Sequence, residues 1–174
     1  MRIAILGSGS RGNSILVSGG STRILVDAGF SARDLEGRLG RVGVSPASVD
    51  AIVVTHDHGD HTRGVGVFAR RHDTPVYLTD ATRAACSSLF RGSEELRRYR
   101  AGFSFQVGDL VVGPFLTVHD ARDPVAVTVT DTLPTGLTAT AISGTGWSCT
   151  QPAGPCTRTN ALAAGDSYPA ITLT

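Results

Sequence analysis

Five residues suited to metal chemistry fall within one stretch of six. Residues 56–61 are His-Asp-His-Gly-Asp-His, so three of the five histidines of the chain lie here. His56 and His58, two apart on an extended chain, lie on the same side and can bind one ion through neutral imidazole nitrogens. Asp60 and His61 then point elsewhere, which suits a second ion about 3.5–4 Å away. We therefore predict a site for one or two metal ions per chain. The alternative is a solvated loop that is rich in histidine by chance.

Two residues outside this stretch are further candidates. His119 follows a long apolar run and is a candidate fourth ligand, although a histidine at the end of a strand is often structural. Asp27 follows another apolar run and is a candidate to orient a ligand imidazole without touching the ion. Asp60 is predicted to act as a catalytic residue as well as a ligand.

Two other patterns have chemical interpretations that their sequence context disfavours. Residues 7–12, Gly-Ser-Gly-Ser-Arg-Gly, match the G-x-G-x-x-G pattern of dinucleotide-binding folds. That pattern opens a helix and is followed by an acid about 20 residues later. Here another strand pattern follows at 14–17, and Asp27 comes too early, so the glycines are interpreted as a tight turn. The four arginines between 91 and 100 could meet phosphates, but a solvated helix face is favoured.

The segments that must position these residues alternate between strand and helix patterns. The helix predicted from Ser31 has a capping-box spacing to Asp34 and is ended by Gly43. A second helix is predicted at 65–71, and a third is capped by Asp80 and runs to about residue 90. Strands are predicted at 2–6, 14–17, 23–26, 51–55, 76–78, 103–107, 110–118, 125–129, 137–142 and 170–173. The fold class is therefore mixed α and β, and the histidine-rich stretch directly follows the buried strand at 51–55.

Composition sets the broad class and suggests two parts. Hydrophobic residues make up 41% and charged residues 18% of 174 residues, enough to bury a core. The net charge of +1 does not by itself indicate nucleic-acid or membrane-surface binding. No stretch approaches the roughly 20 apolar residues of a membrane span, so a cytoplasmic protein without a membrane partner is expected. Because 15 of the 16 arginines and every histidine precede residue 123, we predict domains at 1–123 and 124–174.

The sequence also resembles a known family. Residues 7–14, 25–29, 54–61 and 119–124 carry the motifs, and residues 1–124 resemble the metallo-β-lactamase fold superfamily, in particular its WalJ/YycJ-like branch of small bacterial metallo-hydrolases. The resemblance implies an αββα sandwich, here truncated to its N-terminal half, with a binuclear zinc-type site at one edge. The implied ions are zinc, one or two per chain, with manganese as the alternative. The resemblance also implies that His56, His58 and His119 hold the first metal, and that Asp60 and His61 contribute to the second. The implied chemistry is phosphodiester hydrolysis of the exonuclease type, with a nucleic-acid substrate and water activated by the metals.

The C-terminal part departs from this pattern. The family requires a bridging Asp and a final His after the position of His119, but no histidine follows it. Asp131 comes earlier than the pattern expects, so a second ion is expected to bind weakly or not at all. Residues 124–174 resemble the extracellular β-sandwich repeat of bacterial surface proteins. Cys149 and Cys156 there could form a short disulfide loop, but only in an oxidising compartment. We interpret the chain as a chimera joined near Asp123.

Three functional hypotheses remain open from the sequence. The first is a metal-dependent phosphodiesterase or nuclease, impaired by the missing half of the sandwich. The second is a non-catalytic surface or interaction module with a degenerate front part. The third is another hydrolase of the superfamily that cleaves thioesters or lactams. In each case half a sandwich leaves an apolar sheet face uncovered, which predicts marginal stability and self-association.

Overall fold

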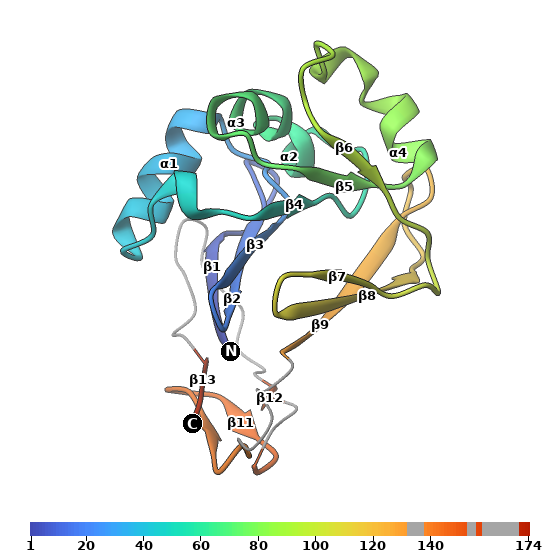
Figure 1. Ribbon diagram of the computed structural model, residues 1–174. Coiled ribbons are helices and arrows are strands. Elements are labelled where there is room, and N and C mark those ends of the chain that lie inside the picture. Colours follow the sequence, from blue (N-terminus) through green and yellow to red (C-terminus); the bar gives the residue numbers. More distant parts are fainter. Residues whose placement is uncertain (132–137, 153–155, 158–170) are drawn as a thin grey trace.

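Two β-sheets packed face to face form the centre of the protein, and helices cover the outer face of the larger sheet (Figure 1). The computed structural model describes residues 1–131, 138–152, 156–157 and 171–174. In this part of the chain no helix has both the length and the apolar character that crossing a membrane requires. The mixed α/β fold class predicted from the sequence is confirmed.

The larger sheet has eight strands in the order β10-β13-β1-β2-β3-β4-β5-β6. Strands β3 to β6 run parallel, while β2 is antiparallel to both β1 and β3. Strands β1, β3, β4, β5 and β6 therefore all end at one edge, which we call the carboxyl edge. The bounds are β1 Arg2–Gly7, β2 Ser14–Gly19, β3 Thr22–Val26, β4 Ala51–Val53, β5 Val76–Leu78, β6 Leu96–Arg98, β10 Ile142–Ser143 and β13 Ile171–Leu173.

The second sheet is antiparallel and has the order β7-β8-β9. Its strands are β7 Phe105–Val107, β8 Leu110–Leu116 and β9 Val125–Asp131. Strand β9 pairs with β8 along seven residues, from Leu116 opposite Val125 to Leu110 opposite Asp131. The chain thus crosses the proposed junction at residue 123 within a single sheet. That a domain ends there stays a prediction.

The helices begin and end largely where the sequence predicts. Ser31 accepts a hydrogen bond from the backbone N–H of Asp34 and caps α1, and Gly43 follows its end with a φ of 73°. A short helix, α2, runs through the second half of the histidine-rich stretch. The bounds are α1 Ala32–Arg41, η1 Pro46–Ser48, α2 Gly59–Thr62, α3 Val65–His72, α4 Asp80–Ala85 and η2 Ser87–Leu89.

Two hydrophobic clusters hold these layers together. One joins the larger sheet to the helices and includes Leu25, Leu35 and Phe68, which are fully buried. The other fills the space between the two sheets and includes Ile24 and Leu110. Because β3 is buried on both faces, Ile24 and Leu25 alternate between the two clusters, as expected for a central strand. Both clusters converge on β3 and β4, which makes these strands a rigid base for the side chains at the carboxyl edge.

Several local predictions were wrong. The third helix is capped by Thr79, whose hydroxyl accepts from the N–H of Thr82, and not by Asp80. Arg97 and Arg98 lie on strand β6 and not on a helix face, because parallel pairing with β5 overrides the helical pattern. Strand β8 ends at Leu116, so His119 lies in a loop after the strand.

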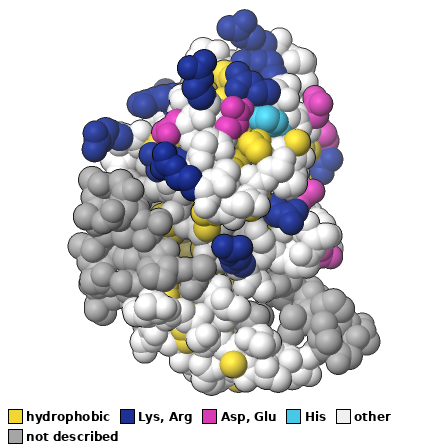
Figure 2. All heavy atoms as spheres, turned by 90° about the vertical axis from the view of Figure 1, so that its left-hand side faces the viewer, with side chains coloured by type: hydrophobic (Ala, Val, Ile, Leu, Met, Phe, Trp, Pro, Cys, Tyr) yellow, Lys and Arg dark blue, Asp and Glu magenta, His cyan; other side chains and the backbone are white. Residues whose placement is uncertain are grey.

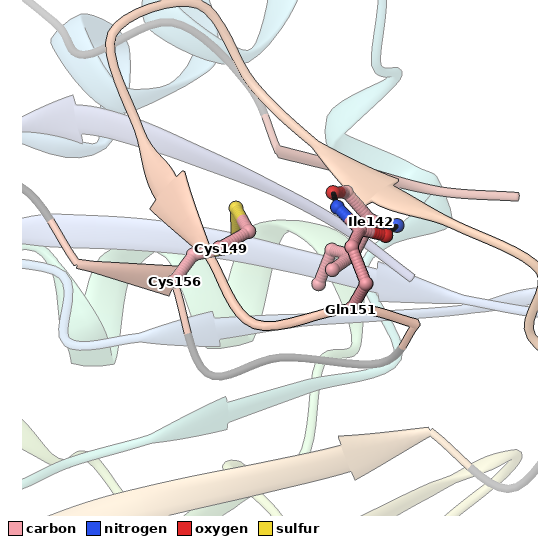
Figure 3. The surroundings of a disulfide bond; sticks show 4 residues. All are labelled: Ile142, Cys149, Gln151 and Cys156. Atoms are coloured by element: carbon pink, nitrogen blue, oxygen red, sulfur yellow. Dashed lines mark hydrogen bonds between the residues drawn. A yellow bond between two sulfur atoms is a disulfide. The ribbon is translucent and has the colours of Figure 1, made fainter.

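Part of the C-terminal region is described. Strands β10 and β13 extend the larger sheet beside β1, and β11 (Ser148–Cys149) pairs with β12 (Cys156–Thr157). Cys149 and Cys156 form a disulfide, and the Gln151 side chain makes two hydrogen bonds with the backbone of Ile142 (Figure 3). The turns predicted at 133–136 and 164–166 lie outside the described residues. Of the strand predicted at 137–142 only Ile142 is in a strand among the described residues, since β10 is Ile142–Ser143. Residue 137, like residue 170 of the strand predicted at 170–173, lies outside the described residues.

The second sheet has an outer face that no described helix covers (Figure 1). On β8, Phe115 and Leu116 are 49% and 65% exposed, and Val118 just beyond it is fully exposed. Because neighbouring residues of a strand point to opposite faces, Phe115 lies on the outer face with Val111 and Gly113, while Leu116 does not. The extended uncovered apolar face expected of half a sandwich stays a prediction. Self-association through this face stays a prediction.

Candidate metal centre

The candidate ligands meet at the carboxyl edge, beside the ends of two central strands. Strand β3 ends at Val26 and leads directly into Asp27, while the chain after β4 leads through Thr55 into the histidine-rich stretch. The loop that carries His119 is brought to the same place, since the N–H of Val125 donates to the carbonyl of Thr55 at 3.1 Å. Residues far apart in sequence are thereby assembled at one point.

Three histidines face one another at this edge. One nitrogen from each of His56, His58 and His119 lies within 4.8 Å of the others, an arrangement that could hold a metal ion. His56 is buried, His58 is half-buried and His119 is exposed. The Nε2 atom of His56 is buried and has no hydrogen-bond partner among the described residues. A buried imidazole nitrogen without a partner is costly, and a metal ion would satisfy it.

The protonation of His56 is set by a chain of hydrogen bonds from Asp27. The Thr55 hydroxyl donates to Asp27 Oδ2 at 2.8 Å, since an ionised carboxylate only accepts. The Thr55 oxygen lies 2.9 Å from His56 Nδ1 and, its proton being engaged, accepts from it. The proton of a neutral His56 is therefore on Nδ1 and the lone pair is on Nε2. Burial, together with the neighbouring His61, lowers the pKa of His56 and favours this neutral form.

His61 is held by Asp27 directly. Its Nδ1 atom lies 2.7 Å from Asp27 Oδ2, so Nδ1–H donates to the carboxylate. Burial acts to lower the pKa of His61, but the hydrogen bond and negative charge of Asp27 outweigh it and raise the pKa. Asp27 is itself fixed by the N–H of Thr55 at 2.8 Å, and it has a left-handed backbone with a φ of 63°. Such a φ is uncommon for Asp and here places the carboxylate beneath both imidazoles.

Asp60 is held by the glycine-rich turn between β1 and β2. The Asn13 side-chain N–H donates to Asp60 Oδ2 at 2.9 Å and lies 3.1 Å from His61 Nε2. The N–H of Gly9 donates to Asn13 Oδ1, which fixes the amide with its nitrogen toward Asp60 and His61. Gly29 lets the backbone of Asp60 come close, since a Cβ at Gly29 would lie 1.6 Å from the Asp60 carbonyl oxygen.

The predicted residues thus separate into two adjacent sets. His56, His58 and His119 form one set, and Asp60 and His61 form another, with 4.0 Å between the rings of His56 and His61. Asp27 lies where the sequence predicts an orienting carboxylate. Asp131, the weak candidate for a bridging carboxylate, ends β9, and its side chain lies outside the described residues.

Sequence reasoning missed two contributors, Asn13 and Thr55. Asn13 belongs to the turn that the sequence marks with glycines, but nothing in the local pattern shows that its amide reaches Asp60, 47 residues away. The apolar pattern at 51–55 predicts Thr55 only as the last residue of a buried strand. Only the folded arrangement shows that its hydroxyl connects Asp27 to His56.

Comparison with known proteins decides the family. Residues 7–145 match the family model described as the metallo-beta-lactamase superfamily. The chain belongs to this superfamily. It is 34% identical over 127 residues to exodeoxyribonuclease YycJ of Bacillus anthracis, and the aligned part makes up 72% of this chain and 48% of YycJ. It is 47% identical over 121 residues to ribonuclease Z of Aeropyrum pernix, covering 60% of this chain and 36% of the relative.

The metallo-beta-lactamase fold is also found among solved structures. The metallo-beta-lactamase fold protein YhfI from Bacillus subtilis superimposes with a TM-score of 0.64 at 20% identity, covering 75% of this chain and 58% of YhfI. The chain spans about half the length of the first two relatives that it matches. The family resemblance of the N-terminal part is confirmed, and the resemblance of residues 124–174 to surface repeats stays a prediction.

Proposed function

We propose that this metallo-beta-lactamase superfamily member is a metal-dependent phosphodiesterase that acts on nucleic acid. The observation that carries the proposal is the convergence of His56, His58 and His119 on one point, with the lone pair of the buried His56 Nε2 unpartnered. The exodeoxyribonuclease and ribonuclease Z relatives favour a nucleic-acid substrate. The likeness to solved structures bears on the fold alone.

The residues present fit a zinc ion at the three histidines. Zinc prefers three or four nitrogen, sulfur or oxygen ligands, and a site with three histidines leaves a position open for water or substrate. The partially exposed His58 and His119 leave that position accessible from solvent. When bound, the ion would polarise a phosphoryl oxygen and activate water for attack.

The other residues of the site position these ligands. Asp27 and Thr55 keep the His56 lone pair on Nε2, and Asp27 does the same for His61. Asp60 and His61 are proposed as ligands of a second ion, and Asp60 as the catalytic carboxylate. The side-chain amide of Asn13 contacts both Asp60 and His61 in the structure, so a second ion must displace this amide. We therefore propose that the first ion binds tightly and the second weakly.

Hydrolysis by the purified, zinc-loaded chain tests this proposal. A bis-aryl phosphodiester and a 5′-labelled single strand, supplied as DNA and as RNA, are expected to be cleaved, and His58→Ala is expected to abolish both activities. His72→Ala is the matched control, because His72 pairs with Glu36 on the helical face.

Other outcomes separate the competing hypotheses. Inertness toward every phosphodiester with zinc or manganese present would favour the non-catalytic module. Cleavage of a thioester or lactam, but of no phosphodiester, would favour another hydrolase of the superfamily.

A further inference from the structure

Two cavities flank the histidines along the carboxyl edge. The first, of about 560 Å³, is lined by the turn between β1 and β2, residues 7–12, together with Phe30, Asp34, Arg38 and Arg63. We call it the glycine-turn pocket. The second, of about 340 Å³, follows the end of β6 and is lined by residues 98–100 and 103–105. We call it the Phe103 pocket.

The glycine-turn pocket is suited to a phosphate group. Arg11 and Arg63 line it, and within the described part of the chain the side chains of both lack an ion-pair or hydrogen-bond partner. Arg38 is fixed, with its guanidinium 3.8 Å from the centre of the Phe30 ring and a hydrogen bond to the Leu6 carbonyl. Asp34 also lines the pocket, but it pairs with Arg38 at 3.3 Å and so offsets only that charge. Two free arginines therefore remain for an anion.

This pocket lies beside the candidate metal centre. Gly12 of its lining precedes Asn13, which contacts Asp60, and Arg63 follows His61 by two residues. Figure 2 shows the side of the protein on which α1 lies, with many arginine side chains on its upper part and fewer acids. The modest net charge thus hides a local excess of positive charge.

The Phe103 pocket offers a different chemistry. The Phe103 ring is 71% exposed, far more than a core aromatic, and Arg98 and Arg100 line the same cavity. Arg98 pairs with the exposed Asp80 at 3.0 Å. An exposed aromatic ring beside arginine is the usual platform on which a base of a single strand stacks.

The order of the strands places the metal centre between the two pockets. The glycine-turn pocket lies at the end of β1 and the Phe103 pocket after β6, with the histidine-rich stretch after β4 between them. Five inter-strand spacings of about 4.8 Å give roughly 24 Å from one end to the other. A single strand of several nucleotides spans that distance, within the site sizes of roughly 4–16 nucleotides that such grooves accommodate.

We propose that the carboxyl edge binds one single-stranded polynucleotide, with backbone phosphates in the glycine-turn pocket and a base stacked on Phe103. The proposal rests on the proposed phosphodiesterase function and adds where the substrate strand lies on either side of the scissile bond. The two pockets hold the strand by different forces. Phosphate contacts weaken with salt, whereas stacking depends on it far less.

Binding of a fluorescent oligothymidylate of about 12 nucleotides, measured by anisotropy over a range of salt concentrations, tests the proposal. Phosphorothioate linkages in the probe suppress cleavage. Arg11→Ala and Arg63→Ala are each expected to weaken binding about fivefold to tenfold at low salt and to reduce the salt slope by about 0.7. Phe103→Ala is expected to weaken binding about fivefold or more without changing the slope.

Matched variants control for loss of charge and of aromatic area. Arg41→Ala removes an exposed arginine of α1 outside the pocket, and Phe115→Ala removes an exposed ring on the second sheet. Both are expected to bind like the wild type. Failure of the wild type to bind, or pocket variants that match their controls, would overturn the proposal. If the protein binds in this pattern but cleaves no phosphodiester, the proposed strand-binding site stands and the proposed enzymatic function is wrong.

Discussion

The two sets of candidate ligands differ in what holds them before any ion binds. One nitrogen from each of His56, His58 and His119 lies within 4.8 Å of the others, and the buried His56 Nε2 has no partner among the described residues, since Thr55 keeps the proton on Nδ1. His58 Nε2 and His119 Nδ1 contact the exposed Asp120, at 3.3 Å from its carbonyl oxygen and 2.8 Å from its carboxylate. Asp60 and His61 are instead engaged by the amide of Asn13. The buried His56 nitrogen is therefore available to an ion, and its two neighbours contact only a solvent-exposed residue among the groups described above, whereas Asp60 and His61 must first give up hydrogen bonds to Asn13.

This difference indicates that the number of ligands is not the only determinant of affinity. A buried lone pair without a partner gains from a metal ion, because its desolvation has already been incurred on folding. A carboxylate that already accepts from Asn13 gains less, because that hydrogen bond must be broken. Three predictions test the comparison, from the largest effect to the smallest, and a fourth concerns a residue outside both sets.

Removing one histidine of the first set should have the largest effect. His58→Ala deletes a candidate ligand at a half-buried position where folding is little disturbed. We expect zinc affinity to fall by more than about 100-fold, beyond the range found for residues that only orient ligands. Competition with a chromogenic chelator measures it. An unchanged affinity would show that the three histidines are not the site.

Asp27→Asn tests whether one carboxylate organises both sets. An amide cannot accept from Thr55 and His61 as a carboxylate does, so both imidazoles lose their fixed protonation. Zinc affinity is expected to fall about 10-fold to 100-fold. Asp50→Asn is the control, because Asp50 likewise accepts a backbone N–H, that of Arg23, but does so at an exposed site. Equal effects of the two substitutions would count against the special role of Asp27.

The site could be predicted from sequence only in part. The spacing at 56–61 identifies the histidines of the site, because side chains alternate in direction along an extended chain. This alternation is a local property that the sequence shows directly. His119 depended on the family resemblance as well as on its place after a strand. Asn13 and Thr55 could not be predicted, because their roles depend on partners 47 and 28 residues away.

The fold shows the same division. Ser31 and Gly43 fixed the ends of α1 by local chemistry, and their predictions held. Strand β6 was missed because Leu96, Arg97 and Arg98 form a strand only through pairing with β5. The pairing of β9 with β8, across the proposed junction, is likewise a tertiary property that composition does not reveal.

Asn13→Ala separates the two sets. Asn13 contacts Asp60 and His61 and makes no hydrogen bond with His56, His58 or His119 in the described part of the chain, so its loss should leave the affinity for the first zinc ion within about twofold. Calorimetric titration with zinc resolves the first binding step. A tenfold loss in that step would show that the sets act as one unit.

Glu94→Gln perturbs neither set and should affect stability alone. Burial would raise the pKa of Glu94, but backbone N–H donors, its own and those of Arg91 and Gly92, and the Arg70 guanidinium lower it to about 2. Its stabilising contribution is therefore present above about pH 4.5 and lost as the pH falls toward 2. We expect a melting temperature lower by roughly 5 °C near neutral pH, a gap that narrows in acid, and unchanged zinc affinity. A constant gap from pH 7 to pH 2 would contradict this.

The stoichiometry of metal binding tests the central claim most directly. Elemental analysis of the purified chain, after zinc loading and removal of weakly held metal, measures the ions that remain bound. The organised histidine set and the occupied Asp60–His61 set together predict one zinc ion per chain, which His56→Ala removes. Two tightly held ions per chain, or one that survives His56→Ala, would contradict the account.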